Sequence, residues 1–207
     1  MGITVSGVGD AIGAPDTVEV DVGVSVLADT VAEATAVAAE RSQAVISALS
    51  TGGVAEDDMT TIDLTIQPEY DYSGNQQRLT GYRVSNTVRA KVRDINGTGA
   101  IVDSVSAAGG DHSRINGLRF SIEDDAKLER AAREAAWSDA AARALQLAEL
   151  SGQRLGPATS ITETIRNPVV PVRMMADMAM AKEASTPIQP GTSTVTVNLQ
   201  VEFAFGD

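Results

Sequence analysis

The sequence predicts an α+β fold in which long Ala-rich helices pack on one face of a mixed, largely antiparallel sheet. Apolar residues alternate strictly with polar ones over residues 18–26 and again over residues 195–205, which is typical of strands buried on one side only. One-sided strands belong to antiparallel or mixed sheets, because parallel sheets are covered on both faces. Two long alanine-rich segments between these strands have helical periodicity and can form the covering layer.

Three more segments alternate in the same way. Residues 82–92 form a long strand-like segment, and residues 61–66 and 118–122 form shorter ones. The outward row of the long segment is basic, whereas Glu19, Asp21 and Glu202 supply acid on other strands. We therefore expect cross-strand ion pairs between these rows. The outward row of the long segment consists of Arg83, Ser85, Thr87, Arg89, Lys91 and Arg93.

Helices are expected at about residues 30–50, 97–108 and 125–151. Asp29 can cap the N-terminus of the first, and the Gly52-Gly53 pair ends it. At three places a helix that ends in glycine leads into a strand, over residues 49–62, 105–118 and 147–161. This order suggests an internal helix-strand repeat.

The longest of these segments pairs Glu129 with Arg133 at i,i+4. Its alanine-rich surface surrounds Trp137. We expect that surface to be buried against the sheet.

Composition sets limits on the architecture and on the partners. The 207 residues, 43% of them hydrophobic, can build the core of a single domain over residues 1–207. Aromatic residues make up only 3%, so small and β-branched side chains must fill that core. The formal charge of -12 argues against nucleic acid and anionic lipid as partners. The sequence contains no cysteine, which excludes disulfides and thiol chemistry.

The sequence shows no targeting or membrane-spanning segment. Met1-Gly2 leads directly into the strand-like Ile3-Thr4-Val5, and no run of about 18 apolar residues occurs. As it stands, the chain is expected in the cytoplasm. A chain in which an initiator methionine replaces a removed signal or lipoprotein leader would look the same, and the resemblance described below favours that interpretation.

No catalytic residue and no cofactor site is recognisable in the sequence. Gly7, Gly9 and Gly13 follow a strand, but Pro15-Asp16 then opens another strand rather than the helix that a phosphate loop requires. We expect a glycine-rich turn there. The single His112 has neither a triad nor a metal cluster around it in the sequence. The acidic runs at residues 56–58 and 123–125 lack the spacing of a calcium loop.

A Pro- and Met-rich segment at residues 167–191 is the strongest candidate for an interaction site, because connections this long are usually functional. Its methionines are soft ligands suited to Cu(I), but the segment offers no Cys or His, so we favour apolar contacts between subunits. Exposed tyrosines at a hairpin end are a second candidate contact. The candidates for subunit contact are Val172, Met174, Met175, Met178, Met180, Tyr70 and Tyr72, and the same four methionines are the candidates for soft-metal binding.

The order of these features resembles the SIMPL-domain family. Ile3-Thr4-Val5-Ser6-Gly7-Val8-Gly9 followed by Pro15-Asp16 is similar to the opening motif of the family, and the alternating strand and Ala-rich helix follow in the same order. Similar elements continue over nearly the whole chain, at residues 60–64, Pro68-Glu69-Tyr70, Gly81-Tyr82, Val92-Arg93-Asp94, Gly117-Leu118-Arg119-Phe120, residues 131–156 and Pro187-Ile188-Gln189-Pro190-Gly191.

The resemblance implies an α+β domain exported to the periplasm or cell surface of bacteria. Members are often lipid-anchored or secreted, are sometimes immunogenic, are linked to stress responses, and in some cases assemble into large ring-like or channel-like oligomers. No catalytic residues are established for the family, so none is assigned to this chain.

Three functional hypotheses follow. The leading one is a non-enzymatic envelope protein that forms homo-oligomers, with no cofactor, through residues 167–191 and exposed sheet edges. The alternative is a binding module for a small ligand or a soft metal ion. An enzyme has the least support, because no nucleophile, cofactor loop or metal constellation is recognisable.

Overall fold

The computed structural model describes residues 2–73, 77–166 and 186–206. Within them lie three α-helices and seven strands, which confirms the α+β prediction. All the strand pairs described are antiparallel. They form two sheets, one of three strands and one of four. The described residues also divide into two compact units, each built around one of these sheets.

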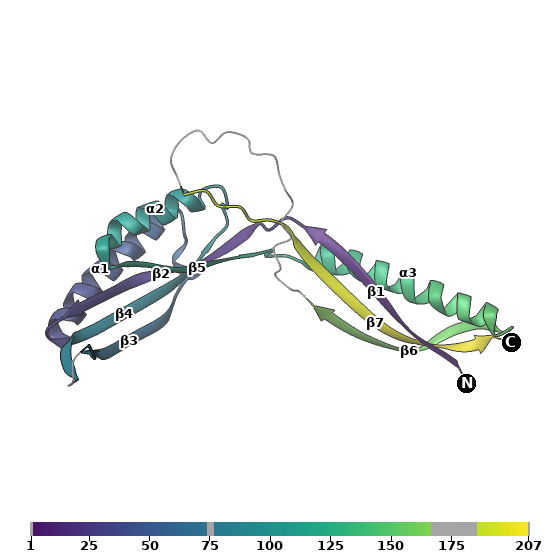
Figure 1. Cartoon of the computed structure of the whole chain (residues 1–207). Coiled ribbons are helices and arrows are strands. Elements are labelled where there is room, and N and C mark those ends of the chain that lie inside the picture. The colour runs from purple at the N-terminus through teal and green to yellow at the C-terminus, as the bar shows by residue number, and fades with distance from the viewer. Residues whose placement is uncertain (1, 74–76, 167–185, 207) are drawn as a thin grey trace. The chain divides into compact units, whose positions relative to one another are not determined.

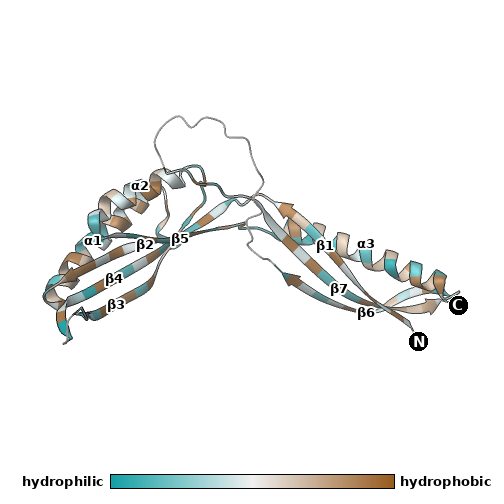
Figure 2. Ribbon diagram, in the orientation of Figure 1, coloured by the Kyte–Doolittle hydropathy of each residue, from teal (hydrophilic) through white to brown (hydrophobic). Residues whose placement is uncertain are grey.

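The four-stranded unit contains β2 (Thr17–Ala28), β3 (Met59–Asp71), β4 (Arg78–Val92) and β5 (Ser113–Ser121), in the order β3-β4-β2-β5. Helices α1 (Val31–Thr51) and α2 (Thr98–Gly109) lie together on one face of this sheet (Figure 1). Two short 3₁₀ turns, η1 (Glu56–Asp58) and η2 (Gly110–His112), follow the two helices. Figure 2 shows the alternation of apolar and polar residues along β2 and β4 that predicted these strands.

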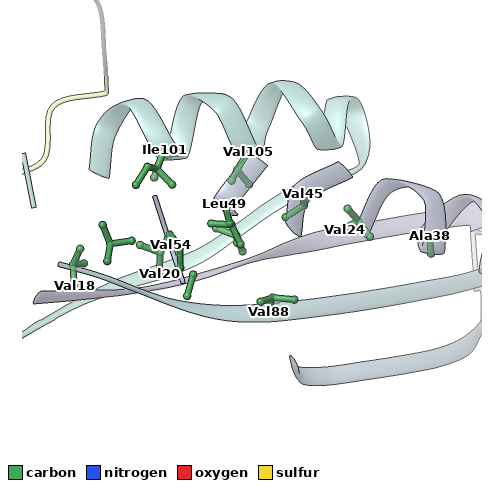
Figure 3. Close-up of a cluster of buried hydrophobic side chains, with 14 of the residues drawn as sticks. Val18, Val20, Val24, Ala38, Val45, Leu49, Val54, Val88, Ile101 and Val105 are labelled. Carbon is green, nitrogen blue, oxygen red and sulfur yellow. The ribbon is translucent and has the colours of Figure 1, made fainter. Parts of the chain in front are cut away.

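The core of this unit is made of small and β-branched side chains, as the composition requires. Val45 and Leu49 of α1 and Val105 of α2 pack over Val20 of β2 and Val88 of β4 (Figure 3). All five are fully or almost fully buried. Short side chains let two helices lie close to the sheet without voids.

Local chemistry sets the limits of α1. Its N-cap is Thr30, whose hydroxyl oxygen accepts from the backbone N–H of Glu33 at 3.2 Å. The prediction of Asp29 was therefore wrong by one residue, and both are favourable capping residues. The helix ends where expected, because Gly53 adopts a φ of 91° that suits glycine best.

The three-stranded unit contains β1 (Gly2–Gly13), β6 (Arg154–Arg166) and β7 (Ser193–Gly206), in the order β1-β7-β6, with α3 (Ala126–Leu150) on one face (Figure 1). The inward row of β7 is buried from Val195 to Phe203, as its alternation predicted, whereas Phe205 at its end is only partly buried. Trp137 of α3 packs against Phe203 of β7, with ring centroids 5.8 Å apart.

Helix α3 presents a ridge of alanines to β1 and β7. The alanine at every fourth position is buried completely or almost completely. Because these side chains are small and lie on one face, the backbone of the helix can come close to the backbone of the sheet. The ridge consists of Ala132, Ala136, Ala140, Ala144 and Ala148.

Glycines on β1 meet this ridge. A Cβ atom on Gly7 would lie 2.2 Å from the carbonyl oxygen of Ala136, and one on Gly9 would lie 2.1 Å from that of Ala132. The expectation of a glycine-rich turn was therefore wrong, because Gly7 and Gly9 lie inside the strand. They leave the space that the backbone of α3 occupies.

One position on the outer edge of β1 is closed by a side chain of α3. A carboxylate oxygen of Asp139 accepts from the backbone N–H of Val8 at 2.9 Å, and Arg143 pairs with the same carboxylate. The Val8 N–H, followed by Arg143, holds the pKa of Asp139 below its usual 3.8. Because this N–H already donates to Asp139, it cannot donate to another strand at this position.

The predicted helix-then-strand order occurs three times, as α1–β3, α2–β5 and α3–β6. Each of these strands is an edge of its sheet. The order therefore places edge strands directly after helices in both units.

Gly9→Ala should destabilise the protein by about 1–3 kcal/mol or more, because the new methyl group overpacks the contact between β1 and α3. The matched control is Gly117→Ala on β5, where a Cβ atom would have no neighbour within 4 Å and where the free energy of unfolding should stay equal or rise slightly. Urea unfolding followed by circular dichroism measures both. Equal effects would contradict the close packing of β1 on α3.

Asp139→Ala should lower the melting temperature at pH 7 and speed hydrogen exchange at the amide of Val8. The folded-state pKa of Asp139 lies below the usual 3.8, so its stabilisation is present above about pH 3.8 and is lost as the pH falls through the folded-state value. The difference in melting temperature between wild type and variant should therefore shrink in acid. The control is the exposed Asp57, whose side chain has no hydrogen bond within the described residues. Asp57→Ala should leave hydrogen exchange at Val8 unchanged.

Candidate functional site

The residues predicted for function fall into two groups. Val172, Met174, Met175, Met178 and Met180 lie outside the described residues, so their roles in subunit contact or soft-metal binding stay predictions. Tyr70 and Tyr72 are described, at the end of β3 and just beyond it.

The two tyrosines form an exposed aromatic pair. Their ring centroids lie 6.3 Å apart, and Tyr72 is 71% exposed. Ser73 donates to the Asp71 carboxylate from both its hydroxyl and its backbone N–H, which lowers the pKa of Asp71. The pair is accessible for contact with another protein.

His112 is not part of a recognisable reactive site. It ends η2, and the Ser106 hydroxyl donates at 2.8 Å to the carbonyl oxygen of Val102 one helical turn earlier. Within the described residues no group of three or more His, Cys, Asp or Glu side chains could hold a metal ion. In the same part of the chain, no helix combines the length and apolarity needed to cross a membrane.

The open face of the four-stranded sheet carries the predicted rows of charge. Arg89 donates twice to the Asp21 carboxylate, at 2.7 and 2.8 Å, and Arg119 pairs with Glu19 at 3.2 Å. The hydrogen bonds from Arg89 lower the pKa of Asp21. The predicted cross-strand pairing is confirmed for Glu19 and Asp21, but Glu202 lies on β7 in the other sheet and is paired across to Thr4 and Ser160.

The remaining arginines of the basic row are also engaged. Arg83 donates to Glu69 at 2.6 Å, which lowers the pKa of Glu69, and Arg93 pairs with Asp58, the last residue of η1. Asn116 donates to Thr87 at 3.4 Å across Gly23, which has no side chain to intervene. The row is thus a set of closed ion pairs and hydrogen bonds that ties strands together, rather than a docking surface for anions.

Sequence reasoning missed the most distinctive surface, which is an exposed apolar row on edge strand β3. Helix α1 packs on β2 and β4, and α2 packs on β5 and β2, so β3 lies outside the cover of the helices. The register places Ile66 beside Val84, whose side chain faces the core. The row consists of Ile62, Leu64 and Ile66, which are 43%, 65% and 49% exposed.

The edge strand β6 repeats this arrangement on a smaller scale. Ile161 and Ile165 are exposed on the face that α3 covers over β1 and β7. Glu163 lies between them and receives three hydrogen bonds from Arg133, at 2.7 to 3.0 Å, which lower its pKa. The predicted i,i+4 partner, Glu129, is 3.8 Å from the same guanidinium.

A shallow hollow of about 190 Å³ lies on the opposite face of the three-stranded sheet. Its polar side chains are all uncharged, and within the described residues none of them has a hydrogen-bond partner in the protein. Each can donate and accept, so the hollow suits a neutral, hydrogen-bonding ligand. It is lined by Ser6, Thr162, Thr164, Asn198, Leu199 and Gln200.

Known proteins with similar sequences span almost all of this chain. Residues 3–203 match the SIMPL family, which is described as a protein of unknown function (DUF541). The chain is 30% identical over 214 residues to the 26 kDa periplasmic immunogenic protein of Brucella melitensis, an alignment that covers 97% of this chain and 83% of that protein. It is 32% identical over 187 residues to the uncharacterized protein YggE of Escherichia coli K12, with 89% and 75% covered.

The family match runs through both sheets and all three helices, from the first residues of β1 to Phe203 of β7. The elements that suggested the resemblance therefore lie within one continuous match. The protein belongs to the SIMPL family.

Proposed function

We propose that this protein is a non-enzymatic, exported envelope protein that assembles with copies of itself through its exposed sheet edges. The observation that carries the proposal is the apolar row of Ile62, Leu64 and Ile66 on β3. Apolar side chains on a long, uncovered edge strand mark an interaction site or an aggregation hazard. A partner that covers these side chains prevents aggregation, and the burial of apolar surface stabilises the complex.

Localisation in the periplasm or at the cell surface is part of the proposal. Its support is the Brucella relative, which is named a periplasmic protein. A lipid anchor on a longer precursor and a role in stress responses belong to the proposal through the family resemblance alone. Both units are taken as one SIMPL domain, because the family match spans residues 3–203.

Additional subunit contacts are proposed at two other places. One is the exposed pair of Tyr70 and Tyr72. The other is the segment of residues 167–191, most of which lies outside the described residues.

A binding module is the second candidate, and the hollow on the three-stranded sheet favours it. Uncharged side chains with free donors and acceptors suit a neutral polyhydroxyl compound better than an ion. Binding of Cu(I) by the four methionines remains a separate prediction.

Leu64→Glu combined with Ile66→Glu should lower the solution mass measured by size exclusion with light scattering, because each copy would bury two carboxylates wherever another copy covers β3. Leu145→Glu on α3, at an exposed site outside the sheet edges, is the matched control and should leave the mass unchanged. A mass that stays high in the β3 variant, or falls only in the control, would contradict the assignment to β3. Unchanged circular dichroism spectra confirm that the variants are folded.

If the hollow binds a neutral polyhydroxyl ligand, glucose should cause saturable chemical-shift changes at the amides of Ser6, Thr162 and Asn198 in an NMR titration. Thr162→Val combined with Thr164→Val should reduce the affinity at least about tenfold, because two hydroxyl partners are lost. Thr194→Val, on β7 but outside the hollow, is the control. Chemical-shift changes that remain linear in glucose concentration would contradict this candidate. An equal loss of affinity in the hollow variant and in the control would also contradict it.

A further inference from the structure

The edge of β3 contains one regular stretch, in which Pro68 alone lacks the N–H needed for pairing. Register shifts interrupt its ladder with β4 between Thr61 and Asp63 and again between Glu69 and Tyr70. From Asp63 to Glu69 the register against β4 is continuous. As the sheet order is β3-β4-β2-β5, the other side of this stretch faces no strand within the described residues.

Pairing of this stretch with itself is restricted by its side chains. A one-residue slip would bring polar side chains opposite apolar ones. When two identical strands pair antiparallel with matching faces, the twofold axis between them must therefore pass through a residue position, not between two residues. Thr65 and Ile66 lie nearest the middle of the stretch. Centring on Ile66 would place Asp63 opposite Glu69, and like charges directly opposite are destabilising.

Centring on Thr65 avoids this conflict and satisfies both faces. Leu64 of each copy then lies opposite Ile66 of the other, so the apolar rows cover one another. On the polar face Asp63 lies opposite Gln67, and the amide can donate to the carboxylate. Within the described residues neither the Asp63 carboxylate nor the Gln67 side-chain amide has a hydrogen-bond partner, so both side chains are available.

The other edges are less suited to pairing with themselves. The edge of β1 is blocked at Val8, whose N–H is already bonded to Asp139. Any register of β6 that is centred between Ile161 and Ile165 and keeps its faces together places Glu163 opposite another Glu163 or an isoleucine. Strand β5 is shorter, with 9 residues against 13 in β3, and its ladder with β2 is interrupted at Asn116.

We propose that two copies of this protein join their β3 strands antiparallel about a twofold axis at Thr65, so that two four-stranded sheets become one continuous sheet. The inference rests on the proposed self-assembly and names the surface and register of one of its contacts. The ladder hydrogen bonds supply part of the stability, and the burial of Leu64 and Ile66 supplies the rest.

Cysteine cross-linking tests the register directly, because the chain has no cysteine of its own. In the proposed pairing the two Thr65 residues are direct neighbours, whereas the two Gln67 residues lie about 13 Å apart along the strands. A disulfide needs Cα atoms within about 7 Å. Oxidation of Thr65→Cys with diamide should thus give at least about ten times the disulfide-linked dimer of the matched control Gln67→Cys.

Leu64→Glu added to Thr65→Cys should abolish the cross-link. Equal yields from Thr65→Cys and Gln67→Cys, a larger yield from Gln67→Cys, or no dimer from a folded Thr65→Cys protein would overturn the proposed pairing. Light scattering of the wild type separates the two proposals. If the wild type is oligomeric but Thr65→Cys does not cross-link, self-assembly stands and the β3 contact is rejected. If the wild type is a monomer and Thr65→Cys does not cross-link, both proposals are rejected.

Discussion

The close approach of α3 to β1 is the constraint on which the three-stranded unit depends. Gly7 and Gly9 leave no room for a side chain between the strand and the carbonyl oxygens of Ala136 and Ala132. The helix is therefore fixed over β1 and β7 at backbone distance, and there its Asp139 reaches the N–H of Val8. The same placement leaves β6 largely outside the cover of the helix. Packing at one edge thus determines exposure at the other.

In the four-stranded unit, too, closely packed helices leave one edge strand uncovered, but here the contact is made by valine instead of glycine and alanine. Its two helices cover β2 and parts of β4 and β5, so β3 extends beyond them with its apolar row in water. In a protein with few aromatic residues, helices lie close to a sheet but each covers a narrow strip. Sheets wider than their helical cover present apolar edges, and both units do so. That shared property is the physical basis of the proposed self-assembly.

Periodicity predicted most of the secondary structure, because alternation and helical spacing are local properties. It predicted β2, β4 and β7 as strands and placed α1 and α3 within a residue or two of their ends. It could not assign strands to sheets, since alternation does not show which strands are neighbours. Glu202 was therefore matched with the basic row of β4, which belongs to the other sheet. The alternation around Leu64 also looks the same whether its apolar side is covered or exposed, so the candidate surface could not be predicted. Gly7 and Gly9 were misread because a glycine near a proline is typical of turns, whereas close packing depends on a helix far away in the sequence.

The hydrogen bond between Asp139 and Val8 also bears on whether association stops or continues. A sheet with two open edges can add copies at both ends without limit, as fibres do. Because this closure of one position on β1 leaves β6 as the freer edge of the three-stranded sheet, strand addition there is favoured on one side only. Protonation of Asp139 in strong acid would weaken that closure and expose a second edge. The hydrogen bond from Val8 to Asp139 thus limits strand addition along β1, and acid is the condition under which that limit would weaken.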